Sequence, residues 1–251
     1  MFHHTLLSEW TKLRTTASFW WTTGLVLLVS IGWAGLLATF TPDGPGAFMT
    51  PDLAHSGFLV FGVPVIMIQA IMVVTTEYRY GLPAANFLAT PRRWQVALAK
   101  VVLYAVIAAL LTLVCLTTSY WLSDLLAPAS VSEWYRPFET DAARRYLWAY
   151  PTFMAVLVVF CQGLGLLLRQ TAGTVALALI WYLGLEQAVR LIPRVGERIL
   201  RYLPFENLNA VLVNMPVRGT EWDVWVSALI FLAWAVVAWV AGVVVLQRRD
   251  A

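Results

Sequence analysis

Few residues in this chain combine the type and the spacing that covalent chemistry needs. Glu186 is the one acidic residue well inside a long apolar run, and Arg190 follows it on the same helical face. At about 1.5 Å per residue, Arg190 lies within about 3 Å of the end of that run and Glu186 within about 9 Å. Long side chains near a span end reach the headgroups, whereas a charge at depth usually marks function. We therefore assign Arg190 to the boundary and keep Glu186 as a candidate functional residue.

Other catalytic and cofactor-binding patterns are missing from the sequence. A phosphate-binding P-loop needs a Gly-Lys-Ser/Thr step, but Lys12 and Lys100, the only lysines, follow Thr and Ala. The histidines form no HExxH motif, and two of the three stand at the extreme amino terminus. No Gly-x-Ser-x-Gly elbow occurs. We expect no enzyme, no catalytic residue and no metal or cofactor held by this chain.

Charge is concentrated instead in the segment 76–100, TEYRYGLPAANFLATPRRWQVALAK, which lies between two apolar runs. It contains one acidic residue, Glu77, and four basic residues. Pro83 can open a helix at its first turn. Phe87 and Leu88 could then face a partner while the arginines pair with its acids or with anionic lipid. Setting topology would explain the charges alone, but not the apolar side chains, so we expect this loop to bind another protein.

The composition places this loop in a membrane protein. Of 251 residues, 60% are hydrophobic and only 12% are charged, about half of the charged share of a soluble domain. The formal net charge of +3 is too small to indicate a nucleic-acid partner. We therefore predict one all-α membrane domain formed by the whole chain, residues 1–251.

Six segments are apolar over the roughly 20 residues that a bilayer-spanning helix needs. They cover residues 19–40, 56–76, 101–123, 146–168, 170–192 and 224–247. Residues 1–18 are expected to form an interfacial helix with an apolar stripe of Leu6, Trp10, Leu13 and Ala17.

Residues 193–223 are expected to form a short outer re-entrant helix pair, broken at Pro204. One stripe of this pair would be Val195, Ile199 and Leu203, and the other Leu208, Val211 and Leu212.

The distribution of Lys and Arg predicts the orientation of these spans. With the amino terminus inside, the inner side holds nine basic and three acidic residues, and the outer side eight basic and eleven acidic. Tryptophans gather near the predicted span ends, as an aromatic belt requires. Both termini are therefore expected in the cytoplasm.

The polar loop and this topology together resemble a known family. Glu77-Tyr-Arg79-x-Gly81 at the end of the second span, then an amphipathic stretch, then Pro91-Arg-Arg93 and Lys100 resemble the permease subunits of type-2 ABC exporters. The segment Ser8-Glu-Trp-Thr-Lys-Leu-Arg14 before a Trp-rich span is similar to actinobacterial members. The resemblance covers the whole chain.

This resemblance implies a partner and a role for the loop. A separate ATPase subunit, which binds ATP and Mg²⁺, would receive a coupling helix from residues 76–100. The residues that match the coupling region are Glu77, Tyr78, Arg79, Gly81, Phe87, Leu88, Arg92 and Arg93. Two permeases, identical or homologous, would enclose a pathway for an amphiphilic substrate (a drug, a peptide antibiotic or a lipid-like molecule) across the bacterial plasma membrane.

Two further functions stay open beside the exporter. Gln69 and Glu186 are candidate pathway residues, although a glutamine in a span is more often an interhelical hydrogen-bond partner. Glu186 could instead serve an intramembrane enzyme. The loop could also hold a partner for a non-transporting scaffold or immunity protein.

Overall fold

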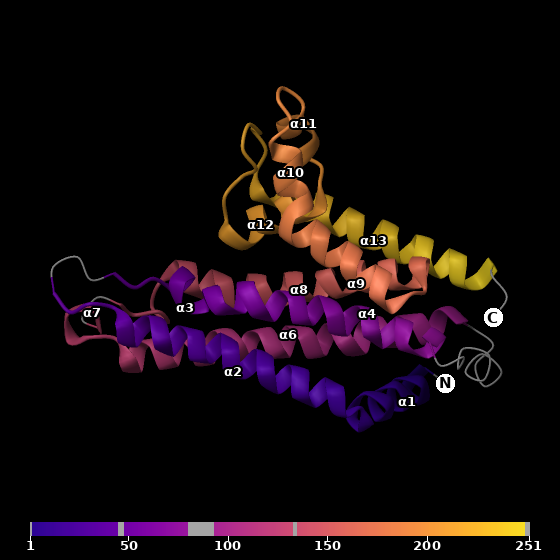
Figure 1. The fold of residues 1–251 in the computed structure, drawn as a ribbon, viewed down its shortest axis with the longest axis horizontal. Coiled ribbons are helices and arrows are strands. Elements are labelled where there is room, and N and C mark those ends of the chain that lie inside the picture. The colour runs from indigo at the N-terminus through magenta and orange to yellow at the C-terminus, as the bar shows by residue number, and fades with distance from the viewer. Residues whose placement is uncertain (1, 45–47, 80–92, 133–134, 249–251) are drawn as a thin grey trace. The chain divides into compact units, whose positions relative to one another are not determined.

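The computed structural model describes residues 2–44, 48–79, 93–132 and 135–248. Helices account for 84% of the structure, and no described residue belongs to a β-strand. The all-α prediction is therefore confirmed. Figure 1 shows the order of the helices along the chain.

Six of the helical segments are long and apolar enough to cross a membrane, and each coincides with a predicted span. Three are α2 (Ala17–Phe40), α6 (Arg93–Leu126) and α8 (Asp141–Leu168), and α13 (Val224–Arg248) is the last. The other two contain a π-helical turn. They are α3 (Pro51–Gly57) continued by α4 (Val63–Arg79), and α9 (Thr171–Ile180) continued by α10 (Glu186–Arg190).

The shorter helices are α1 (Phe2–Thr15), α7 (Ala129–Ser132), α11 (Gly196–Leu200) and α12 (Pro204–Val213). The predicted break at Pro204 is where α12 begins, and its predicted stripe of Leu208, Val211 and Leu212 is buried. Val195 and Ile199, two residues of the stripe predicted for α11, are exposed, and the interfacial role of that stripe stays a prediction. Leu200 and Gly196 fill the buried face of α11 instead.

The chain divides into two compact units, whose boundaries fall inside α1, α4, α6 and α8. One unit comprises the residues up to Thr11, residues 67–105 and the chain from Ala155 on. Its core includes Val74, Ala97, Leu166, Val243 and Leu246. The other comprises Lys12–Ile66 and Val106–Met154, with Met49, Tyr120, Val131 and Tyr135 in its core. The prediction of a single domain stays a prediction.

Two glycines bring α8 and α13 into close approach. A Cβ added to Gly163 would lie 2.5 Å from the backbone nitrogen of Trp239. A Cβ added to Gly242 would lie 2.8 Å from the carbonyl oxygen of Gly163. Small residues of this kind let membrane helices pack with their backbones near each other.

The turn between α8 and α9 is short, because only Arg169 and Gln170 separate the two helices. Arg169 adopts a left-handed backbone with φ of 53°, and its N–H donates to the carbonyl of Gly165 at 2.9 Å. This is a left-handed C-terminal cap, unusual for a residue that is not glycine.

Candidate functional site

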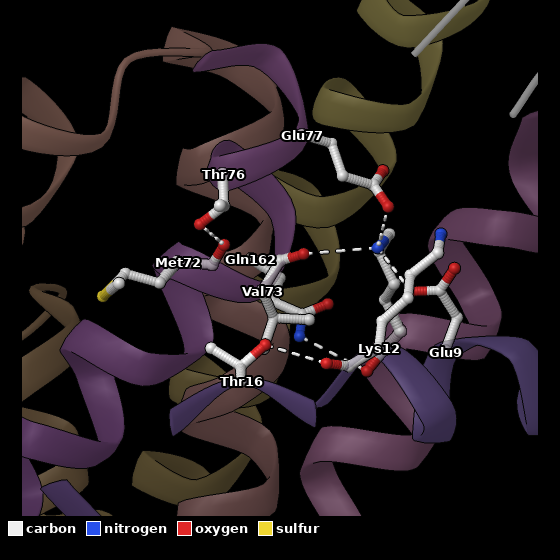
Figure 2. Close-up of polar contacts among 9 residues, drawn as sticks. Glu9, Lys12, Thr16, Met72, Val73, Thr76, Glu77 and Gln162 are labelled. Atoms are coloured by element: carbon white, nitrogen blue, oxygen red, sulfur yellow. Dashed lines mark hydrogen bonds and ion pairs between the residues drawn. The ribbon is translucent and has the colours of Figure 1, made fainter. Parts of the chain in front are cut away.

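A buried ion cluster surrounds Lys100, which is only 5% exposed. Its Nζ donates to Glu9 Oε2 at 2.5 Å and to Glu77 Oε1 at 2.9 Å. The same nitrogen lies 3.3 Å from the carbonyl oxygen of Val73. Figure 2 labels Glu9, Val73 and Glu77, the residues whose oxygens accept from Lys100. We call Glu9, Lys100 and Glu77 the Lys100 cluster.

Three helices supply this cluster, and two of them, α4 and α6, flank the segment 80–92. Glu77 lies in the last turn of α4, and Lys100 lies two turns into α6, so the pair bridges the two ends of that segment. Glu9 comes from the middle of α1, where it is the buried residue of the helix. The cluster therefore ties the amino-terminal helix to both helices from which the predicted coupling loop extends.

Burying three charged side chains costs free energy unless they lie close to one another. Moving an ion from water into a protein interior costs several kcal/mol, which only close, well-oriented partners offset. The side chains of Lys100, Glu9 and Glu77 are 6%, 5% and 17% exposed. Removing one partner from such a pair costs about 3–5 kcal/mol, because the remaining charge stays buried. The cluster is therefore expected to be stable only when all three charged side chains are present.

Two buried glutamines connect the helices around the cluster. Gln162 of α8 donates through Nε2 to the carbonyl oxygen of Lys100 at 3.3 Å. Gln69 of α4 accepts a hydrogen bond from the hydroxyl of Tyr104 in α6 at 2.5 Å. Both glutamines thus act as interhelical partners, the more common role of such a residue in a membrane span.

Glu186 is engaged in capping another helix. Its Oε1 accepts from Trp181 Nε1 at 3.0 Å and from the N–H of Phe205 at 2.9 Å, and its Oε2 accepts from the N–H of Glu206 at 2.5 Å. Phe205 and Glu206 lie in the first turn of α12, whose N–H groups lack intrahelical acceptors. A carboxylate there also complements the helix dipole. Arg190 pairs with Glu206 at 2.6 Å and joins the same two helices.

The remaining coupling candidates are only partly described. Tyr78 lies beneath the guanidinium of Arg169, with the carbon of that group 5.0 Å from the ring centre. Arg93 Nη1 is 3.4 Å from the carbonyl oxygen of Leu246, near the end of α13. Arg79 ends α4. The other four candidates, Gly81, Phe87, Leu88 and Arg92, lie outside the described residues.

Sequence reasoning missed the role of Glu9. The apolar stripe Leu6, Trp10, Leu13 and Ala17 is predicted to lie at the membrane interface, whereas the side chain that α1 buries within the chain is Glu9, which is 4% exposed against 36% for Trp10. Hydrophobicity alone could not identify this face, because the buried side chain is a charge whose partner is 91 residues away in the sequence. The position of Lys100 directly before the predicted third span was the one available signal.

A second buried polar network centres on His55, which is 1% exposed. Its Nε2 lies 3.0 Å from the hydroxyl of Tyr150 and its Nδ1 lies 3.1 Å from that of Tyr120. The hydroxyl of Tyr146 donates to Asp52 at 2.7 Å. The prediction placed His55 before the second span, but the helix begins at Pro51. Thr50, which accepts a hydrogen bond from the N–H of Leu53, is the N-cap signal that the apolar pattern concealed.

Within the described residues, no group of three or more His, Cys, Asp or Glu side chains is placed to hold a metal ion. No protein-family model matches the chain, and no curated protein matches it.

Proposed function

We propose that this chain is the membrane subunit of an ATP-binding cassette exporter, driven by a separate ATPase subunit. The observation that carries this proposal is the Lys100 cluster. It joins Glu77 at the end of α4, Lys100 near the start of α6 and Glu9 of α1 through buried contacts of 2.5–2.9 Å. If a partner displaces this loop, the helices at its two ends must be held together, as the Lys100 cluster holds them. Otherwise the loop alone would bend, and the displacement would not reach the helices.

The Lys100 cluster would pass a displacement of the loop on to α4, α6 and α1. Closure of the ATPase subunits on Mg²⁺ and ATP would displace the loop 76–100. Because Lys100 bridges both ends of the segment 80–92, α4 and α6 would move together, and Glu9 would draw α1 with them. The residues of the loop that contact the ATPase would be those that match the family pattern. Of these, Tyr78, Arg79 and Arg93 would lie nearest the Lys100 cluster.

A second permease, identical or homologous, would complete the translocation pathway. In the most apolar stretch of the fifth span 17% of the residues are buried within the chain, against 61% in the fourth, so most residues of the fifth span have surface left for lipid or for another subunit. The pathway would take an amphiphilic substrate such as a drug, a peptide antibiotic or a lipid-like molecule. Gln69 stays a pathway candidate.

The setting of this exporter would be the bacterial plasma membrane, with both termini in the cytoplasm. The excess of basic residues on the side of the termini and of the loop supports this orientation. No nucleic acid is expected as a partner.

Two rival functions differ from the exporter in a measurable way. An intramembrane enzyme would need Glu186 free to react, but hydrogen bonds from three donors occupy its two oxygens. A non-transporting scaffold or immunity protein would bind a partner through the same loop without any response to ATP.

The test is gentle purification of the tagged chain from its native membrane, followed by identification of the proteins that accompany it. We expect a P-loop ATPase with the wild-type chain and at least about tenfold less of it with Glu77→Ala/Arg79→Ala, a loss of about 1.4 kcal/mol in binding. Glu139→Ala is the control for loss of an acidic side chain outside residues 76–100, because Glu139 forms an exposed ion pair with Arg136. Absence of any ATPase from the wild-type preparation would refute the exporter.

A further inference from the structure

A cavity of about 390 Å³ opens where α4 ends and α9 begins. Its volume falls within the range of pockets that hold small ligands. The residues that line it are Thr75, Tyr78, Arg169, Gln170, Thr171 and Ala172. The site shares no residue with the Lys100 cluster, and none of the described residues that line it is acidic.

Arg169 supplies the charge of this cavity. One of its terminal nitrogens, Nη2, donates to the carbonyl of Val245 at 3.3 Å, and the guanidinium stacks over Tyr78. Its Nε is buried and has no hydrogen-bond partner. No described carboxylate forms an ion pair with Arg169. A guanidinium has five N–H donors, and the one bond to Val245 leaves donors of the terminal nitrogens for an acceptor from outside the chain.

Both threonine hydroxyls in the cavity already donate within the chain, so the donors left over are those of Arg169 and of the start of α9. The hydroxyl of Thr171 donates to Thr75, and that of Thr75 donates to the carbonyl of Ile71, each at 2.9 Å. Gln170 is exposed and makes no side-chain cap at the start of α9. The first N–H groups of a helix lack intrahelical acceptors, so those at Thr171 and Ala172 add to the donors. A ligand that fits must bring negative charge and several acceptor oxygens.

We propose that this cavity binds a phosphate group, with Arg169 as its principal ligand. A phosphate offers the planar pair of oxygens that a guanidinium fork matches. The source that fits best is the headgroup of an anionic phospholipid. Arg169 lies at the end of one membrane-spanning helix and Leu168 beside it is 47% exposed, so acyl chains have an apolar surface next to the charge. Free inorganic phosphate offers the same chemistry without this apolar contact.

Lipid bound in this cavity would also affect two neighbouring helices, α13 and α4. Arg169 holds the carbonyl of Val245 in the last turns of α13, and its ring partner Tyr78 follows Glu77 in α4. The bound phosphate would fix Arg169 and so stabilise the end of α13 against α4. This proposal does not require an ATPase partner and stands apart from the exporter.

The test compares lipid binding by the purified chain in nanodiscs of phosphatidylcholine with increasing phosphatidylglycerol, read by native mass spectrometry and by thermal unfolding. We expect phosphatidylglycerol to bind and raise the unfolding temperature of the wild type. Arg169→Gln should weaken this binding about fivefold or more. Arg194→Gln should bind like the wild type, since Arg194 is an exposed arginine with the same left-handed backbone, at φ of 67°, and does not line the cavity.

A second variant controls for the chance that Arg169→Gln disturbs the fold of the turn between α8 and α9. Ala172→Trp would fill the cavity from an exposed position while leaving the contacts of Arg169 to Val245 and Tyr78 in place. It should lose phosphatidylglycerol binding as Arg169→Gln does.

Inorganic phosphate added to phosphatidylcholine nanodiscs distinguishes the two sources. No stabilisation by millimolar phosphate would assign the site to lipid, whereas full stabilisation would assign it to free phosphate. Unchanged phosphatidylglycerol binding in both cavity variants would overturn the site. So would binding that is lost equally in Arg194→Gln, or loss of a co-purified ATPase from Arg169→Gln without any change in lipid binding.

Discussion

Lys100 replaces the water around its ammonium group with oxygens of Glu9, Glu77 and Val73. Each of these residues would be unremarkable on a surface. They matter because they are buried: a buried charge that has lost its partner costs far more free energy than a buried neutral pair. The same reasoning applies to Glu186, whose two oxygens accept from an indole and from two backbone N–H groups.

The first prediction concerns the loss of the lysine. Lys100→Met leaves two carboxylates buried without the ammonium, so the free energy of unfolding should fall by about 3–5 kcal/mol. Denaturant unfolding of the detergent-solubilised chain measures this. The triple variant Glu9→Gln/Lys100→Met/Glu77→Gln should recover a large part of the loss, because no unpaired charge remains. A triple variant as unstable as Lys100→Met would show that packing of the lysine stem, not charge, holds the site.

The second prediction separates a cap from a catalyst at Glu186. Glu186→Gln keeps the shape of the side chain but turns one acceptor into an N–H₂ group that faces the start of α12. We expect a loss of about 1–3 kcal/mol in stability and faster amide hydrogen exchange at Phe205 and Glu206. Unchanged stability and exchange in this variant would remove the capping role and favour the enzyme.

At the scale of the helices, close packing at glycines sets how α8 and α13 meet. The Cβ of an alanine at Gly163 would lie 2.5 Å from the backbone nitrogen of Trp239, so the backbones would have to separate. Gly163→Ala should destabilise the chain by about 1–3 kcal/mol. The matched control is Gly32→Ala in α2, where nothing lies within 4 Å of the added Cβ. The control should be neutral or slightly stabilising, because alanine favours a helix. Equal effects at both positions in thermal unfolding would contradict the close approach.

How far the sequence predicts this fold depends on the range of the interactions concerned. Hydrophobicity over about 20 residues is a local property, and it located all six long helices. Pro204 likewise marked the start of α12. The buried face of α1 and the capping role of Glu186 could not be predicted, because each depends on a partner in another helix. Those partners are known only once the helices pack together.

The candidate site was predicted in part. Glu77 and Lys100 belong to the loop that the charge pattern selected, and the structure joins them through an ion pair of 2.9 Å. The pattern assigned Glu77 to the partner interface and gave Lys100 no partner inside the chain. Charge position alone does not distinguish an internal ion pair from one made with another protein.

For the whole molecule, the asymmetry of basic residues predicts which ends face the cytoplasm. Single cysteines test this in a chain whose two buried native cysteines are replaced by alanine. A cysteine at Glu139 should react with an impermeant maleimide in intact cells. One at Arg248 should react only after the membrane is opened. The reverse pattern would place the termini outside and remove the loop from a cytoplasmic ATPase.

The measurement that bears most directly on the exporter is hydrogen exchange of the purified permease–ATPase complex, with and without Mg²⁺, ATP and vanadate. We predict that the trapped nucleotide changes exchange in residues 2–11, 67–79 and 93–105 together. In Lys100→Met the change should stay near the loop, because the cluster no longer joins the three helices. Unchanged exchange in these segments of the wild type, or the same change in Lys100→Met, would contradict transmission through the Lys100 cluster.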